Sequence, residues 1–368
     1  MATEGSEGTS DVVGALGAGI GQVPASWDLE ADVVVIGAGA TGLPAAIAAV
    51  DAGASVIVVE ANYDIGGHAI LSGGNVPLGG GTSAQRKYGI QDAPDLVFAD
   101  LTDWSVVQPN GWPDYRYNDR TVMRAFADHC VAASEFLVAT GVQFKDVPPD
   151  NSGAHSTGNS APRENHAFWT EGTGLGSPSG RDGAGLVRPL EASARAKGVK
   201  FLLNHKMTAL VRAASDTAEP GRVIGITVQY APRILPGAST PLQSYRSEGN
   251  LHSTQPRVAI HAKKAVILAT GGSTSNVHFR RMFDPRLTDV YQTAGEPYTF
   301  QDASGELAAM AVGASLWGLG NQILENGDGV RTQRALGARY NYFSWDLNSP
   351  IFPLVRAAGL DVRDWQNV

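Results

Sequence analysis

The chain has 368 residues with 44 glycines and 20 prolines, which predicts a loop-rich protein of about two domains. With 43% hydrophobic and 17% charged residues it can bury a sizeable core, which excludes a wholly disordered chain. The formal net charge of -8 and the absence of any Lys/Arg block argue against a nucleic acid or an anionic membrane as partner. The single cysteine, Cys130, excludes an intrachain disulfide and a cysteine-rich metal site, so we expect no metal and a cytoplasmic protein.

Residues 1–28 are predicted to form a flexible N-terminal arm, because they are small and polar and lack the basic start and apolar stretch of a secretory signal. The uncharged run 33–50 contains three glycines and a proline, which argues against a membrane span. We read it as a buried strand, a tight turn and a helix, and expect no membrane span.

The first strand, Asp32–Ile36, runs directly into the turn Gly37-Ala38-Gly39-Ala40-Thr41-Gly42. Small residues through Ala52 then predict a helix that packs closely on a sheet, and Ser55–Val59 predicts the next strand. That strand ends at an acid, Glu60. A glycine turn in this setting is typical of dinucleotide binding, whereas an isolated one is only an ordinary turn.

Each residue of this motif has an expected role. Gly37 makes the tight turn, Gly39 lets the backbone approach a pyrophosphate, and Gly42 lets the helix pack on the strand. The N-terminus of the helix offers free N–H groups to the phosphates, and Glu60 can accept from ribose hydroxyls. The alternative is a glycine-rich turn that binds nothing.

The choice of dinucleotide depends on two further glycine clusters. A nicotinamide enzyme normally continues with plain helix and strand, but here glycines recur at 66–74 and again at 79–82. Far downstream, the apolar strand 265–269 ends in Thr270-Gly271-Gly272. Two separated strand-to-glycine sites suggest one long cofactor, which favours FAD over a nicotinamide.

Together these motifs resemble the fumarate reductase/succinate dehydrogenase flavoprotein superfamily, which includes 3-ketosteroid Δ1-dehydrogenases, over about residues 29–320. The resemblance implies an α/β fold, with a Rossmann-like FAD-binding domain of parallel sheet plus β-meander at 29–272 and a partial α+β capping domain at 273–368.

The resemblance also implies cofactor contacts along the whole motif set. The diphosphate would contact Gly37, Gly39, Ala40, Thr41 and Gly42, and the adenosine ribose would contact Glu60 and Ala61. The pyrophosphate and flavin would lie along Gly67, His68, Ala69, Ser72, Gly73 and Gly74. The adenine side would meet Met207 and Thr208, and Ala269, Thr270 and Gly271 would close over the cofactor.

His68 has two possible roles: covalent attachment of FAD, or packing and hydrogen bonding. Succinate dehydrogenases attach FAD through a histidine in this region, but here the register is one residue short and Ala69 stands where those enzymes have threonine. We therefore expect non-covalent FAD and a packing or hydrogen-bonding His68. Four residues separate His68 from Gly73, a spacing more like that of the ketosteroid dehydrogenase branch.

Residues 119–140 predict an amphipathic helix that begins near Asp119 and ends before Gly141. Its apolar residues at spacings of three and four predict a buried face made of Val122, Phe126, Cys130, Ala133 and Leu137. Cys130 is then a core residue, and a reactive thiol is the alternative.

The polar segment 148–181 predicts a long loop that is either mobile or functional. Its side chains could reach a substrate or could simply be solvated; they are His155, Arg163, His166 and Trp169. Beyond it we predict four strands: Phe201–Leu203, Val223–Tyr230, Val258–Ile260 and Val266–Leu268. Ser304 stands where the superfamily often has an acid, so that position is assigned no role.

The superfamily implies hydride transfer between flavin N5 and a CH–CH or C=C bond next to a carbonyl or carboxylate, on a steroid-like or carboxylic acid substrate. We assign no catalytic residue, because Arg331, Arg334, Arg339 and Tyr340 fit surface positions equally well. The last residues contain no further strand-glycine-helix unit. The main expectation is an FAD-dependent oxidoreductase. The alternative is an FAD-binding but catalytically incomplete chain: a fragment, or a subunit whose flavin site a second chain completes.

Overall fold

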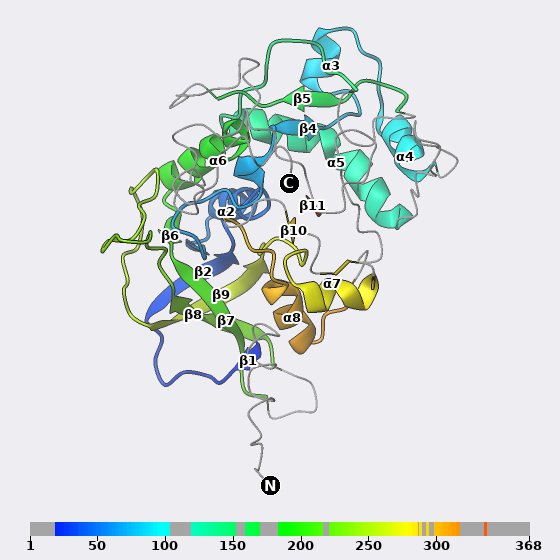
Figure 1. Cartoon of the computed structure of the whole chain (residues 1–368). Helices are drawn as coiled ribbons and strands as arrows, with labels where there is room; N and C mark the ends of the chain where they lie inside the picture. The colour runs from blue at the N-terminus through cyan, green and yellow to red at the C-terminus, as the bar shows by residue number, and fades with distance from the viewer. Residues whose placement is uncertain are drawn as a thin grey trace.

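The structure is a computed structural model that describes residues 19–103, 119–151, 159–169, 183–215, 221–285, 287–288, 292–293, 298–316 and 335–336. Its main feature is a seven-stranded sheet in the order β1-β7-β8-β9-β2-β3-β6 (Figure 1). The strands are β1 Gly19–Gly21, β2 Leu29–Ile36, β3 Val56–Val59, β6 Lys200–Leu202, β7 His205–Arg212, β8 Val223–Tyr230 and β9 Arg257–Leu268. Strand β1 lies within the predicted arm and pairs with β7.

The central strands are parallel, so their carboxyl ends meet at one edge. β2 lies between β3 and β9, and Ile36 is the register partner of both Val59 and Leu268. Residues 33–36 are buried, as expected for a strand covered on both faces. The other half of the sheet is the antiparallel meander β7-β8-β9. The predicted combination of parallel sheet and meander is therefore confirmed.

Strand β9 corrects one prediction, because the separate strands 258–260 and 266–268 are parts of a single 12-residue strand. The exposed polar pair between them stays in the strand because β9 pairs with β2 on both sides of it, with a register shift between Ala31 and Val33. The Nζ of Lys263 lies 3.2 Å from Glu30, and that of Lys264 lies 3.5 Å from Asp32.

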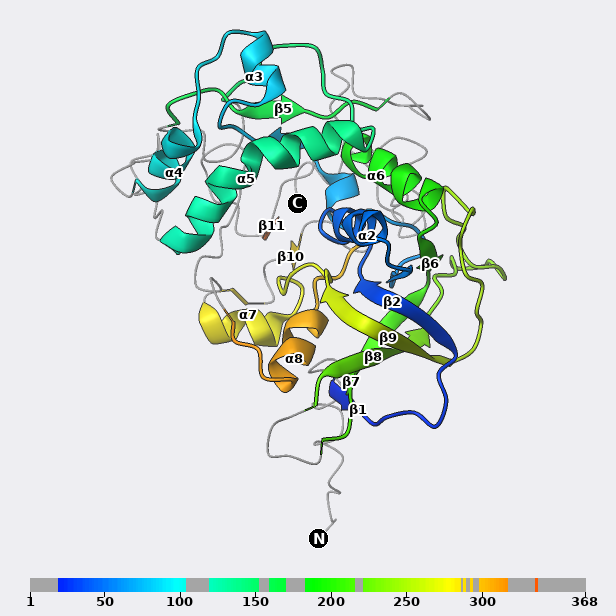
Figure 2. The same cartoon turned by 180° about the vertical axis from the view of Figure 1, so that it is seen from behind.

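Helices cover both faces of the sheet (Figure 2). On one face, α2 (Gly42–Asp51) and α6 (Ala184–Ala196) bury Leu43, Ile47 and Leu190 against Val33 and Val35. On the other face, α8 (Ser304–Ala311) contributes Ala308 to a cluster with Val34 and Ile36. Alternate residues of β2 thus enter opposite cores.

A second group of elements lies beyond α2 and α6, at the top of Figure 1. It consists of α3 (Ser83–Lys87), α4 (Pro94–Thr102), α5 (Arg120–Ala139) and the antiparallel pair β4 (Asn75–Pro77) and β5 (Glu164–His166). The short helix η1 (Ala69–Leu71) precedes this group in the chain, and its Ile70 and Leu71 lie in the core formed with α2 and α6. The remaining elements are α7 (Val277–Phe283) and the parallel pair β10 (Gln292–Thr293) and β11 (Ala335–Leu336). No helix in these described stretches is long and apolar enough to cross a membrane.

Helix α5 was correctly predicted in extent, and Asp119 caps it by accepting from the N–H groups of Thr121 and Val122. The predicted buried face was wrong in part. Val122 and Phe126 are 47% and 43% exposed, and Ala133 is exposed as well. The helix instead turns its small residues Ala127, Cys130 and Ser134 inward, because these fit against β4 and α4. Cys130 is a core residue, as predicted.

Candidate functional site

Three chain segments that are distant in sequence meet at the carboxyl edge of the parallel strands. The N–H of Gly37 donates to Val59 O at 2.7 Å, and the N–H of Ala269 donates to Ile36 O at 2.8 Å. The N–H of Glu60 donates to Leu202 O at 2.9 Å. The turns that begin at Gly37, Glu60 and Ala269 therefore lie side by side.

The three glycines of the first turn have different steric settings. Gly37 has φ +101°, and a Cβ there would lie 2.2 Å from Ala269 O, while a Cβ on Gly42 would lie 1.8 Å from Gly37 O. Both positions require glycine for the fold itself. A Cβ on Gly39 would meet no atom closer than Gly66 O, at 3.9 Å. The fold leaves Gly39 open, so glycine there suits close approach by a ligand.

Glu60 is buried and binds the first turn directly. Its Oε2 accepts from the N–H of Ala38 at 2.8 Å, and its Oε1 accepts from the N–H of Asn62 at 2.9 Å. Burial raises the pKa of Glu60, and these two N–H groups oppose that effect. Each oxygen keeps a second lone pair, so the carboxylate can still accept from a hydroxyl. Its neighbour Ala61 is exposed, as are Ala40 and Thr41 across the edge.

The second glycine segment packs against the first. The N–H of Gly66 donates to Ala38 O at 2.9 Å, and a Cβ on Gly67 would lie 3.8 Å from the Cα of Gly39. Ser72 closes the segment, since its hydroxyl donates to Ala69 O at 2.8 Å and accepts from the N–H of Gly74 at 3.2 Å. The structure thus brings the residues predicted at the diphosphate and flavin to one place.

The residues predicted at the adenine, Met207 and Thr208, lie on β7 next to Glu60, because the N–H of His205 donates to Glu60 O at 2.9 Å. The side chain of Met207 is buried in the core. The Thr208 hydroxyl lies 2.9 Å from that of Thr227, at a register shift between β7 and β8. Both side chains thus make contacts within the protein.

Sequence reasoning missed residues 298–303, which join the separate turns. The carbonyl of Tyr298 accepts from Asn62 Nδ2 at 2.6 Å and from Arg233 Nη2 at 3.0 Å. The N–H of Ala303 donates to Gly272 O at 3.3 Å. Gly305 follows and packs on Thr270, where a Cβ would lie 1.9 Å from Oγ1. No local pattern marks these contacts, because their partners lie far away in the chain.

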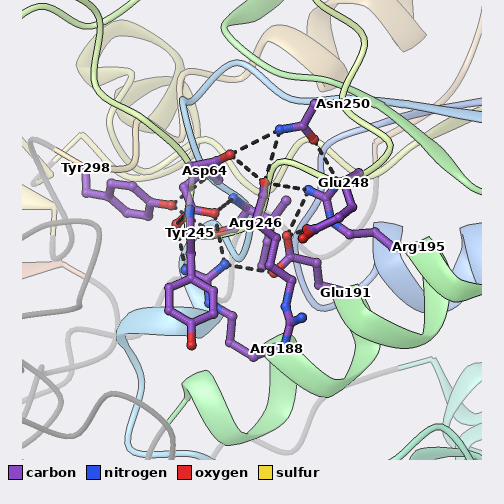
Figure 3. Close-up of polar contacts among 11 residues, drawn as sticks. Asp64, Arg188, Glu191, Arg195, Tyr245, Arg246, Glu248, Asn250 and Tyr298 are labelled. Carbon is purple, nitrogen blue, oxygen red and sulfur yellow. Dashed lines mark hydrogen bonds and ion pairs between the residues drawn. The ribbon is translucent and has the colours of Figure 1, made fainter.

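An ion cluster anchors the chain just after Glu60 and Asn62 (Figure 3). Arg188 of α6 lies 2.6 Å from Asp64 and 2.8 Å from Glu191, and Arg195 lies 2.9 Å from Glu191. Burial opposes the charge on Arg188, but the two carboxylates outweigh it and raise the pKa of the guanidinium. Arg188 also stacks 4.6 Å from the ring centre of Tyr245. The cluster ties α6 and the β8–β9 connection to the site.

Two side chains of the predicted loop, those of Arg163 and His166, are held by contacts within the protein. Arg163 is buried, with Nε 2.8 Å from Asp92 and Nη1 2.6 Å from Asp100. His166, on β5, lies between Asn75 at 3.1 Å and Asp150 at 2.9 Å. Trp169 is half-buried. His155, Arg331, Arg334, Arg339 and Tyr340 lie outside the described residues. Within the described ranges, no group of three His, Cys, Asp or Glu could hold a metal ion.

Comparison with known proteins gives one family match and several relatives. The model of the FAD binding domain family matches residues 32–316. The chain is 26% identical over 298 residues to a urocanate reductase of Eggerthella lenta, covering 80% of this chain and 40% of that protein. It is 27% identical over 263 residues to the acrylate reductase flavoprotein subunit of Shewanella woodyi, covering 71% and 43%.

Among solved structures, a 3-ketosteroid-Δ4-(5α)-dehydrogenase from Rhodococcus jostii RHA1 matches with a TM-score of 0.58 and 26% identity. That match covers 79% of this chain and 55% of the dehydrogenase. The chain thus spans about half the length of the relatives that it matches, and it resembles a urocanate reductase, an acrylate reductase subunit and a ketosteroid dehydrogenase alike.

Proposed function

The chain belongs to the FAD binding domain family, within the fumarate reductase/succinate dehydrogenase flavoprotein superfamily, and on that premise we propose that it is an FAD-dependent oxidoreductase acting on CH–CH or C=C bonds. The observation that carries the proposal is the edge of the sheet. There an open Gly39, the start of α2 and the carboxylate of Glu60 lie together.

The residues at this edge suit FAD. In our proposal the backbone at Gly39, Ala40 and Thr41 binds the diphosphate, since these residues lead into the N-terminus of α2, where Thr41 makes no side-chain cap hydrogen bond. Glu60 and Ala61 bind the adenosine ribose. The remaining contacts come from Gly67, His68, Ala69, Ser72, Gly73, Gly74, Met207, Thr208, Ala269, Thr270 and Gly271.

The chemistry supplied by bound FAD is hydride transfer at N5 of its ring. The chain's own residues bind and orient: Glu60 holds the first turn through Ala38, and Gly67 lies against Gly39. A proton donor or acceptor on the neighbouring carbon is also needed. We assign that role to none of the described residues.

For the substrate, we propose a small molecule whose reacting bond is next to a carboxylate or a carbonyl. Support comes from the relatives, which are named for urocanate, acrylate and a ketosteroid. We propose the cytoplasm as its location, on the grounds of the single cysteine. Our alternative is a chain that binds FAD but needs a second polypeptide for turnover.

The experiment is anaerobic: FAD-loaded protein is mixed with a reduced dye and urocanate, acrylate or fumarate, and separately in oxidised form with a 3-ketosteroid. Oxidation of the dye when urocanate, acrylate or fumarate is added supports the proposal of an oxidoreductase, and so does bleaching of the flavin by the steroid. Bound FAD with no turnover supports the two-chain alternative. Failure to bind FAD overturns both.

A further inference from the structure

Gln301 links the two glycine turns on either side of the site. Its Nε2 lies 3.1 Å from Nδ1 of His68, and its Oε1 accepts a hydrogen bond from the hydroxyl of Thr274. Its side chain lies over the glycine pair, since a Cβ on Gly271 would be 3.7 Å from its Cγ and one on Gly272 would be 3.5 Å from its Oε1. One amide thus joins the turn after Gly66 to the turn after Ala269.

The backbone of Gln301 is fixed independently of its side chain. Its N–H donates to Ser275 Oγ at 3.0 Å, and its carbonyl accepts from the N–H of Ser275 at 2.9 Å. The amide can therefore serve as a rigid support rather than an adaptable contact.

The hydrogen-bond chemistry of the amide defines the state of His68. The NH2 group of glutamine can only donate, so Nδ1 of His68 must accept. An imidazole that accepts at Nδ1 is neutral and carries its proton on Nε2. The Thr274 hydroxyl donates to the oxygen of this amide, and the NH2 group lies toward His68.

The surroundings of His68 agree with a neutral ring. Burial lowers the pKa of His68 to about 4. A neutral ring adds no positive charge to the site.

We propose that Gln301 is a positioning residue of the cofactor site, which fixes His68 as the neutral Nε2–H tautomer and holds it in register with the Gly271–Gly272 turn. This inference rests on the proposed function, because His68 is one of the residues assigned there to FAD.

The first test reads the tautomer directly, by 15N NMR of histidine-labelled protein with and without FAD. The His68 signals are identified by their loss in a His68→Asn variant. We expect Nδ1 to show the shift of an acceptor nitrogen and Nε2 that of a protonated one. A proton on Nδ1 in the unmodified protein would overturn the proposal, whether or not FAD binds.

The second test reverses the polarity of the contact. Gln301→Glu replaces the donor with an acceptor, so the proton of His68 should move to Nδ1 and FAD should bind about tenfold more weakly or worse. Gln301→Met removes the contact without adding charge and should weaken FAD binding several-fold. The matched control is Gln255→Glu at an exposed loop position.

The control should leave both the His68 signals and the FAD dissociation constant unchanged. Gln301→Glu protein with unchanged His68 signals and unchanged FAD affinity would overturn the proposal. If that variant does not fold, the 15N spectrum of the unmodified protein still tests the proposed tautomer of His68. Failure of the unmodified protein to bind FAD would instead count against the proposed function. The two failures can be told apart, because the tautomer of His68 is also measured in the absence of FAD.

Discussion

The N–H of Ala38 donates to Oε2 of Glu60 at 2.8 Å, so the glycine turn after β2 and the acid after β3 form one unit before any ligand binds. The other carboxylate oxygen accepts from Asn62. A dinucleotide that enters this edge meets a carboxylate already oriented by two N–H groups. Such a preformed site loses little entropy when it binds.

Replacing Glu60 with glutamine is therefore expected to weaken both the fold and FAD binding. A glutamine side chain can accept from only one of the two N–H groups, since its NH2 faces the other as donor against donor. We expect a loss of about 1–3 kcal/mol in unfolding free energy and about tenfold weaker FAD binding. Urea unfolding and FAD titration measure the two effects. The exposed Glu30→Gln serves as control, and equal effects of both changes would contradict this account.

The first turn offers a contrast between two glycines. Gly42→Ala should destabilise the protein by about 2–3 kcal/mol, because its Cβ would lie 1.8 Å from Gly37 O. Gly39→Ala should leave thermal unfolding nearly unchanged but weaken FAD binding at least about tenfold, since the methyl group enters the space beside the diphosphate. Unaltered FAD affinity in folded Gly39→Ala protein would contradict the proposal that the backbone at Gly39 binds the diphosphate.

Arg188 should be essential for stability. Arg188→Met leaves Asp64 buried without its cation and leaves Glu191 with Arg195 alone, for which we expect a loss of about 3–5 kcal/mol. The control is Lys87→Met, which removes an exposed pair with Asp146 and should hardly move the denaturation midpoint. Similar midpoints for the two variants would show that the cluster in Figure 3 contributes nothing.

Replacing Arg163 distinguishes a role in stability from a role in substrate binding. Burial would raise the pKa of Asp92, but hydrogen bonds from Arg163, Gly80 and Gln85 outweigh it and lower the pKa to about 2. Arg163→Met should cost about 3–5 kcal/mol of unfolding free energy and leave the FAD affinity of the folded fraction unchanged. A stable variant that has lost only substrate turnover would assign Arg163 to the substrate.

The lowered pKa of His68 predicts how the free energy of unfolding changes with pH. Its pKa is about 4 in the folded protein, below the ordinary value of 6.5, so the unfolded chain binds the proton more readily. The stability that depends on neutral His68 is fully present above about pH 6.5 and is lost as the pH falls toward 4. The difference in unfolding free energy between the unmodified protein and His68→Asn should shrink over that window. A difference that stays constant would contradict a buried neutral ring.

Local patterns predicted the fold well where strands and turns carry their own signals. The strand of residues 223–230 was predicted with its observed bounds, and the strand, turn and helix around Gly37 follow from β-branched and small residues. The same patterns failed on the face of α5, because Val122 and Phe126 are apolar but face away from the group of residues that buries Cys130.

Contacts between distant residues could not be predicted at all. Gln301 and His68 are separated by 233 positions, and nothing near either residue marks the other as its partner. The polar pair Lys263 and Lys264 misled the strand prediction for a similar reason, since its carboxylate partners lie on β2. Chemistry that depends on tertiary contacts needs the folded chain.

The most direct test of the central claim is a titration of the purified, cofactor-free protein with FAD, followed by flavin fluorescence and compared with NAD. We predict saturable binding of one FAD per chain with a dissociation constant of about 1 μM or lower, together with weak or no NAD binding. Folded protein that fails to bind FAD, or that binds NAD more tightly, would contradict the account.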